Sequence, residues 1–440
     1  MEFVLPPCGR APGIVLALGV FFLLASQTPD SRASTNGGSE EPSLHEIESG
    51  ILDADFSPGE ATSNTPAELD EIYAPHQGDL DGLGMNHPFD LLANPLKSLN
   101  QSTGLRLGVA NTFLYLQPMG GQSDRYGAAG DTDFLSSWTL LGRDTEDTGR
   151  LVTTVEYRYS IGDQPPSVVG RQIGTLVPVT NGFNDRGWVV RDAYWIQRLF
   201  NARLRILVGR GYASDFVGAY WLQNVNNSFV NRNFSANPSI PFPGHGPILG
   251  FSLRPTDLYY ITCGVSNAYS QTTRNGFDTL FNEWSLFSFA EVGLTPTFRK
   301  IGSGRYALGM WHIDERSING LPADSGLTVI LDQNLGEHLQ VFGRYSYSDG
   351  LITNVRQLAQ TGLGLSGTPG RKDDLTGAAF SLAEPRLSTS RDEAVVEIFH
   401  RFQVSQYSQF SVGLQLIANP GNAPSAASEG IIYARFRASF

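Results

Sequence analysis

The chain has 440 residues, with 31 Lys and Arg against 43 Asp and Glu, a formal net charge of −12, and two cysteines. This length allows two or three ordinary domains or one large β-domain, and it supports a core without disulfide staples. The two cysteines, Cys8 and Cys263, are too few for a disulfide framework or a thiolate zinc site. The acidic balance argues against nucleic-acid binding, which requires a basic face.

The acidic charge is concentrated in one segment. Residues 34–100 contain 13 Asp and Glu and one base, Lys97, whereas residues 101–440 contain 28 acidic and 28 basic residues. Of the latter bases, 26 are arginine and only Lys300 and Lys372 are lysine. The sequence therefore divides into an acidic extension and a neutral, arginine-rich body.

The N-terminus has the pattern of an export signal. Arg10 precedes an apolar run from Gly13 to Ala25, and Ser31-Arg32-Ala33 follows with the small residues that suit signal peptidase. Thirteen apolar residues extend about 20 Å as a helix, short of the roughly 30 Å of a hydrocarbon layer. We therefore expect a cleaved signal peptide at residues 1–33, with an uncleaved segment as the alternative.

Residues 34–100 are rich in Glu, Asp, Pro, Ser, Thr and Gly and poor in aromatic residues. Such a composition buries too little apolar surface to offset the entropy lost on ordering. We expect this extension to be mostly disordered or loosely docked. Two short apolar pieces, Leu44–Phe56 and Phe89–Leu99, are candidates for docked helices.

After residue 103 the hydrophobic pattern has a period of two. In residues 151–161, Leu151 and Tyr157 lie on one parity, and Glu156 and Arg158 lie on the other. One apolar face for lipid or core and one polar face for water is the pattern of a half-buried strand. The same alternation recurs in residues 203–208, 339–348 and 393–404, and a weaker strand is expected in residues 352–366.

The connections between the predicted strands alternate in length. Short links lie near residues 201–202, 255–256, 300–303, 336 and 405–408, and long ones span residues 162–186, 211–245, 268–283 and 314–325. Short turns on one rim and long loops on the other are typical of outer-membrane barrels. We therefore predict an all-β fold, a transmembrane antiparallel β-barrel of about 16 strands over residues 101–440, with 14 or 18 strands as alternatives.

The last strand supports this fold. Ile432, Phe436 and Phe440 share one face, while Tyr433 and Arg435 lie on the other. An apolar strand that ends the printed sequence in Phe resembles the assembly signal of outer-membrane barrels. We expect the barrel-assembly machinery to bind Phe440, and we expect an outer membrane of the Gram-negative type, with the acidic extension in the periplasm.

A series of short segments follows in order along the chain. They are Leu204–Arg210, Arg254–Tyr260 with Gly264-Val265, Gly304–Trp311, Asp332–Leu335, Phe342–Tyr345, Arg371–Asp374, Glu397–Gln403 and Gln415–Gly421. On these segments the sequence from Ala193 to Phe440 resembles the OprB family of carbohydrate-selective porins. The order and spacing of these pieces are more specific than any one of them. The resemblance implies a 16-stranded outer-membrane channel for sugars.

Strand parity directs a set of polar side chains into the predicted lumen. They are Arg205, Glu291, Asp332, Gln340, Arg344, Glu397, Arg401, Gln415, Arg435 and Arg437. A sugar pore needs hydrogen-bonding groups and planar surfaces, and the guanidinium fork supplies both. Our hypothesis is that Arg205, Glu291, Arg344, Glu397 and Arg401 form a selectivity region that contacts the sugar. The alternative is a ladder of mutually satisfied wall charges, as in any barrel.

The 211–245 segment is the candidate constriction loop. It is long, contains six asparagines, and carries aromatic rings, a mixture that suits sugars. We expect Trp221, Asn224, Asn227 and Phe229 to line the constriction. A plain surface loop is the alternative.

The predicted function is passive diffusion of sugars or other small neutral solutes by a monomer or trimer in contact with outer-membrane lipid. No metal or other cofactor is expected, because the seven histidines are scattered without ligand spacing. A general diffusion porin with little sugar preference is the first alternative. An outer-membrane lipid- or glycan-processing enzyme and an exported soluble β-protein are others, although no Gly-x-Ser-x-Gly motif supports an enzyme.

Overall fold

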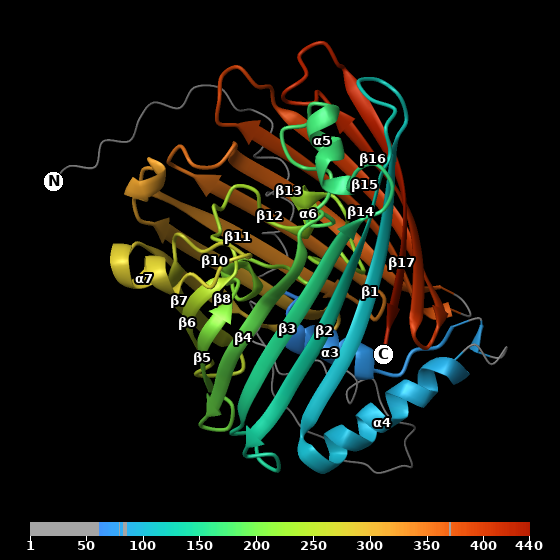
Figure 1. Ribbon diagram of the computed structural model, residues 1–440, viewed down its shortest axis with the longest axis vertical. Coiled ribbons are helices and arrows are strands. Elements are labelled where there is room, and N and C mark those ends of the chain that lie inside the picture. The colour runs from blue at the N-terminus through green and yellow to red at the C-terminus, as the bar shows by residue number, and fades with distance from the viewer. Residues whose placement is uncertain (1–60, 79, 82–85, 369–370) are drawn as a thin grey trace. The chain divides into compact units, whose positions relative to one another are not determined.

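The computed structural model describes residues 61–440 except residues 79, 82–85 and 369–370 (Figure 1). The predicted signal peptide, residues 1–33, and the candidate helix Leu44–Phe56 lie outside the described residues.

Sixteen strands form one closed antiparallel ring, which confirms the predicted barrel and its strand number. They are β1 (Leu105–Pro118), β2 (Gly127–Leu141), β3 (Gly149–Ser160), β4 (Gly187–Leu199), β5 (Leu204–Gly211), β6 (Gly246–Leu253), β7 (Tyr259–Asn267), β8 (Leu286–Leu294), β10 (Gly302–Ile313), β11 (Asp324–Leu335), β12 (Leu339–Ser348), β13 (Val355–Thr368), β14 (Arg371–Pro385), β15 (Glu393–Ser405), β16 (Ser408–Ala418) and β17 (Ser428–Ser439). The two-residue β9 (Thr297–Phe298) pairs only with the start of β10 and adds no member to the ring. The weak strand expected in residues 352–366 is β13.

The ring closes where β17 pairs with β1. At this seam, Val109 and Phe440 exchange two main-chain hydrogen bonds of 2.9 and 3.0 Å. Closure pairs the backbone groups of both terminal strands, which an open sheet edge would leave without partners in lipid.

The two faces of the wall have the polarity that the alternation predicts. On β17, the side chain of Ile432 on the outer face is 46% exposed, whereas Tyr433 and Arg437 on the inner face are each 3% exposed. On the outer face, Trp188 stacks on Tyr157 with 4.6 Å between ring centroids. An apolar outside and a polar inside is the arrangement of an outer-membrane barrel.

The two rims differ in loop length (Figure 1). Long connections hold short helices: η3 (Pro166–Val168) and α5 (Val169–Gln172) lie between β3 and β4, α7 (Phe277–Glu283) between β7 and β8, and η5 (Ser317–Asn319) between β10 and β11. At the opposite rim, β4 and β5 are joined by Phe200, Asn201 and Ala202, with φ angles of 61°, 56° and 58°. The predicted alternation of connections is therefore present.

Two helices precede the barrel within the acidic extension. The first, α3 (Thr65–Tyr73), begins at Asn64, whose side chain accepts a hydrogen bond of 2.9 Å from the Ala67 N–H. The second, α4 (His87–Thr103), contains the candidate helix Phe89–Leu99 and ends at Gly104, which has a φ of 73°. In the described part of the chain, no helix combines the length and the apolar character needed to cross a membrane.

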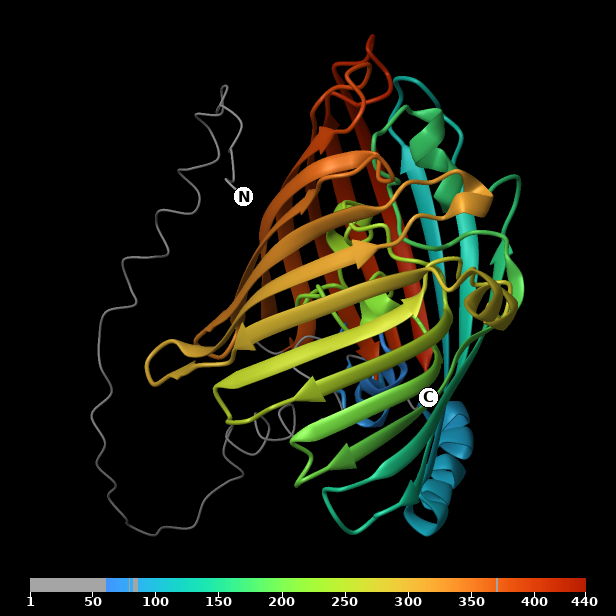
Figure 2. The same ribbon diagram turned by 90° about the vertical axis from the view of Figure 1, so that its left-hand side faces the viewer.

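We expected the acidic extension to be mostly disordered or loosely docked. The structure differs from this expectation at α3. Leu69 and Ile72 are buried and pack with Ala110 of β1 and Leu135 of β2. The composition of residues 34–100 suggested disorder because the segment has too little apolar surface to fold by itself, and Leu69 and Ile72 make further contacts outside it. Their partner is the inner wall of the barrel, and Figure 2 shows α3 inside the ring of strands.

Candidate functional site

The candidate functional site is the lumen, which is partly filled by the connection between β5 and β6. We call this connection, residues 212–245, the inward loop. It contains η4 (Ala213–Asp215) and α6 (Arg232–Ser235), and nearly all of its residues are buried. Its rings pack on the wall: Tyr220 stacks on Phe342 with 4.1 Å between centroids, and Phe229 meets Phe399 edge to face at 5.0 Å. The loop expected to fold inward does so.

Two buried wall carboxylates hold the main chain of the inward loop. Glu397 accepts hydrogen bonds from the N–H groups of Val230 and Asn231 at 2.7 and 2.8 Å. Glu291 accepts one from the N–H of Gly218 at 2.9 Å. Because each carboxylate satisfies donors that are removed from water, each fixes the path of the loop.

A tyrosine completes each carboxylate site, from the adjacent strand β7 for Glu291 and from β17, two strands from β15, for Glu397. The Tyr433 hydroxyl donates to Glu397 at 2.7 Å, and the Tyr260 hydroxyl donates to Glu291 at 2.6 Å. Neither tyrosine was among the candidate residues, although the strand parity of β7 and β17 places both on the inner face. The two wall sites therefore share one design of a carboxylate, a tyrosine and loop N–H groups.

Wall arginines bind the carbonyl groups of the same loop. Arg344 donates to the carbonyl oxygens of Gly218 at 3.1 Å and Asn233 at 3.2 Å, and it also contacts the carbonyl of Ala236. Arg435 donates to the carbonyl of Ser228 at 2.9 Å. A guanidinium is suited to this role because its donors form a fixed planar fork.

Arg305 of β10 was not among the candidate residues. It pairs with Asp332 at 2.8 Å and also contacts the carbonyl of Ala219. The alternation of β10, in which Tyr306 and Leu308 face outward, would have indicated that Arg305 faces inward.

The five predicted wall residues all lie on the inner face, but they are not equally accessible. Glu291, Arg344 and Glu397 are buried beneath the inward loop, Arg205 is buried on β5, and Arg401 is half-buried. Arg401 donates to the carbonyl of Asn227 at 3.3 Å. The side chains of Glu291, Arg344 and Glu397 thus contact the loop and do not form an open surface for a solute.

The four predicted loop residues divide in the same way. Asn224 and Phe229 are buried, whereas Trp221 and Asn227 are partly exposed. The N–H of Trp221 is 3.4 Å from a carboxylate oxygen of Asp332. Among the predicted site residues, Trp221, Asn227 and Arg401 are therefore the ones with surface left for a solute.

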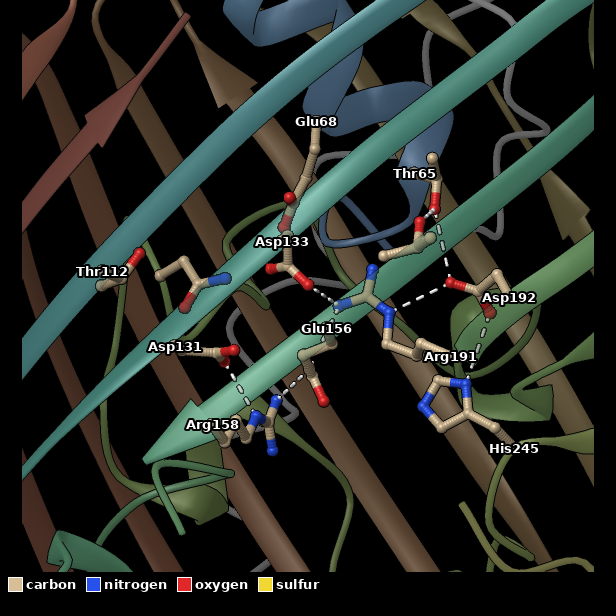
Figure 3. Close-up of polar contacts among 12 residues, drawn as sticks. Thr65, Glu68, Thr112, Asp131, Asp133, Glu156, Arg158, Arg191, Asp192 and His245 are labelled. Carbon is tan, nitrogen blue, oxygen red and sulfur yellow. Dashed lines mark hydrogen bonds and ion pairs between the residues drawn. The ribbon is translucent and has the colours of Figure 1, made fainter. Parts of the chain in front are cut away.

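A cluster of acidic and basic side chains lies on the inner face of β2 to β4 (Figure 3). Arg158 pairs with Asp131 at 2.9 Å and with Glu156 at 2.7 Å. Arg191 pairs with Asp133 at 3.4 Å and with Asp192 at 3.0 Å.

Oxygen atoms of Asp131, Asp133 and Glu156 lie within 4.8 Å of one another, close enough to share a cation. The guanidinium groups of Arg158 and Arg191 already compensate these carboxylates. The chemistry of the cluster is that of an ion-pair network rather than of a metal site.

His245 and Thr65 contact the same carboxylate without forming a catalytic relay. His245 Nδ1 is 3.3 Å from one oxygen of Asp192, and the Thr65 hydroxyl donates to the other oxygen at 3.3 Å (Figure 3). Burial lowers the pKa of His245 to about 4, so the ring is neutral at pH 7. A hydroxyl nucleophile would need to contact the imidazole itself, and here the carboxylate separates them.

The fold matches that of known porins. The barrel superposes on the high-pH structure of Pseudomonas putida OprB with a TM-score of 0.67 and 14% sequence identity, over 79% of this chain and 97% of that chain. The porin AaxA of Chlamydia abortus is 23% identical over 301 residues, and that of Chlamydia caviae is 23% identical over 309 residues. Each match covers 66% of this chain and 65% of the relative, so the chain spans just under two thirds of the length of these curated relatives.

Residues 139–440 match the family described as "Carbohydrate-selective porin, OprB family". This stretch is more than half of the chain, and it contains β3 to β17, the inward loop and every predicted wall residue. The chain belongs to the OprB family of carbohydrate-selective porins.

Proposed function

We propose that the chain is a passive diffusion channel for carbohydrates and similar small neutral solutes in the outer membrane. The observation that carries this proposal is a closed barrel with a polar inner face, into which the inward loop folds and is held by Glu291, Arg344 and Glu397. A fixed loop in a polar lumen limits solute size and supplies hydrogen-bonding groups without any chemical step. Family membership supports sugars as the solute class.

Within this function, Trp221, Asn227 and Arg401 are the proposed solute contacts. All three are partly exposed, and they offer an aromatic face, an amide and a guanidinium. A ring and a planar fork suit the two sides of a pyranose, one apolar and one rich in hydroxyls. Glu291, Arg344 and Glu397 act indirectly, by positioning the loop that carries Trp221 and Asn227.

Swelling of liposomes that contain the purified full-length protein tests the function. We expect faster swelling in neutral monosaccharides than in organic anions or cations of similar size. Equal rates for all three would favour the general diffusion porin, and swelling no faster than in protein-free liposomes would overturn the channel function. Release of product from labelled lipid or glycan would instead support the enzyme.

We also propose that Phe440 contributes to recognition by the barrel-assembly machinery, and that the acidic extension enters the barrel from the periplasmic side. Phe440 lies at the β1–β17 seam, and its ring is 5.8 Å from that of Phe89 of α4. Phe440→Ala should lower the amount of heat-modifiable protein in outer-membrane fractions, whereas Phe410→Ala, which changes an exposed ring of the outer face on β16, should not.

A further inference from the structure

Helix α3 is a second element inside the lumen, and neither the predicted channel nor the inward loop accounts for it. It lies on the inner face of β1 to β3, where the Thr65 hydroxyl contacts that of Thr154 at 2.5 Å. The wall makes room for it at Gly108: a Cβ atom at this position would lie 2.9 Å from Ile72 Cδ1 and 3.0 Å from Leu69 Cδ2. The helix and the wall therefore pack closely, because the helix presents Leu69 and Ile72 at a position where the wall has no side chain.

The α3 segment is also hydrogen-bonded to the inward loop. The Asn227 side chain donates to Glu71 at 2.9 Å, and the Asn224 side chain donates to the carbonyl of Thr62 at 3.1 Å. The N–H of Ala61 donates to the carbonyl of Asp215 at 2.9 Å. Hydrogen bonds thus join helix and loop inside the lumen.

The charges of α3 complement the wall next to it. Arg401 on β15 and Arg435 and Arg437 on β17 project from the inner face. Arg435 and Arg401 donate to neutral carbonyl groups of the loop, and Asp373 and Asp374 lie near Arg401. Glu397 beside them is engaged with loop N–H groups.

Two carboxylates of α3 face these guanidiniums. Glu68 is 3.5 Å from Arg437, and Glu71 accepts a hydrogen bond from Gln409 at 3.2 Å on the strand between them. Burial raises the pKa of Glu71, but Arg437, Arg401, His76 and the hydrogen bond from Gln409 together lower it by more, so its pKa lies below the ordinary value. The helix therefore supplies negative charge next to Arg437 and Arg401.

We propose that α3 is a resident part of the constriction that sets both the charge preference and the size limit of the channel. Its two carboxylates offset the charges of Arg401 and Arg437, and its body occupies lumen that would otherwise be open. A neutral solute then meets little net charge at the narrowest level, as sugar passage requires. The inference rests on the proposed channel function and assigns a role to part of the acidic extension.

The charge arm of the test uses the double variant Glu68→Gln/Glu71→Gln in planar bilayers under a KCl gradient at pH 8, where Glu68 is ionised. We expect the permeability ratio of Cl⁻ to K⁺ to rise about twofold or more, because uncompensated arginines attract anions. The matched control is Glu337→Gln, the same change at an exposed turn between β11 and β12, which should leave the ratio unchanged. An unchanged ratio in the double variant overturns the role of α3 in charge preference.

The size arm deletes residues 61–78 from the full-length chain. We expect single-channel conductance to rise about twofold or more and larger oligosaccharides to enter in the swelling assay. Unchanged conductance of a heat-modifiable, folded deletion protein overturns the role in size. If the deletion protein does not fold, the charge arm alone decides, because it keeps the helix.

The ion measurements separate this inference from the proposed function. A wild-type protein that conducts ions but passes no sugar contradicts the sugar channel, while the change in ion preference still tests α3. A wild-type protein that passes sugar, with variants indistinguishable from it, contradicts only the role of α3.

Discussion

The side-chain amide of Asn227 donates a hydrogen bond of 2.9 Å to the carboxylate of Glu71, which joins the inward loop to α3 across 156 positions of sequence. Asn227 belongs to the connection between two barrel strands, and Glu71 belongs to a helix that precedes the first strand. The lumen is thus narrowed by two segments that support each other.

Arg344→Ala should loosen the inward loop. The guanidinium binds the carbonyls of Gly218, Asn233 and Ala236, and losing buried charge-assisted hydrogen bonds costs on the order of 2 kcal/mol or more. We expect higher and noisier single-channel conductance, and no rescue by Arg344→Lys, because an ammonium lacks the planar fork.

The matched control for Arg344 is Arg203→Ala, which removes an arginine at the exposed turn before β5. Conductance traces of Arg344→Ala that match the wild type would show that the position of the loop does not depend on the hydrogen bonds of Arg344.

Trp221→Ala should slow sugar entry more than ion flow. The ring is partly exposed in the lumen. Its loss removes a stacking surface and leaves the hydrogen bonds between the wall and the loop in place. We expect a fall of about twofold or more in the swelling rate with monosaccharides, with KCl conductance changed less. Trp188→Ala, on the lipid face, is the control and should change neither rate. Equal effects of the two substitutions would show that Trp221 does not contact the solute.

Stability should depend on pH through Glu68. Burial raises the pKa of Glu68 from 4.5 to about 7. Arg437 and Arg191 lower it, whereas Asp133 and Glu71 raise it. Between pH 4.5 and 7 the unfolded chain has lost this proton while the folded chain keeps it, so the stabilising contribution is complete below pH 4.5 and decreases as the pH rises through 7.

Glu68→Gln should therefore match the wild type in Tm at pH 4 and exceed it at pH 8, by a free energy on the order of 1–3 kcal/mol. Differential scanning fluorimetry of the detergent-solubilised protein at both pH values measures this. A variant that is less stable at pH 8 would show that the pair with Arg437 outweighs the cost of burying the charge.

Gly108→Leu should displace α3 from the wall. The inner face of β1 accepts Leu69 and Ile72 only because position 108 has no side chain. We expect residues 61–78 to become sensitive to limited proteolysis while the barrel remains heat-modifiable. Gly343→Leu is a control on β12, since its Cβ would find only one atom within 4 Å, at 3.9 Å. Equal protection of the segment in both variants would contradict the close packing.

Period-two alternation was sufficient to predict the barrel and the direction of its side chains. Parity assigned Glu397 and Arg344 to the inner face because a strand side chain has two choices of face. It could not show that these groups would hold a loop, since their partners are main-chain atoms of Val230 and Gly218, which carry no sequence signal. The long 211–245 segment was identified by its length, its asparagines and its aromatic rings.

Helix α3 could not be predicted from composition. Glu68 and Glu71 suggest a solvated segment, because isolated charges are rarely buried. Glu68 is buried here and Glu71 is half-buried, since Arg437 and Arg401 approach from strands more than 300 positions later. The partners of a charge are set by the closed topology, which places β17 next to β1 and both next to α3.

The wall holds the inward loop through main-chain atoms. Glu291 and Glu397 accept from N–H groups, and Arg344 and Arg435 donate to carbonyl oxygens. Every residue except proline offers both groups, whatever its side chain. Substitutions at the solvent-facing positions of the loop can therefore change the solute preference of the proposed channel without releasing the loop. New specificities can then arise while the barrel and the path of the loop stay the same.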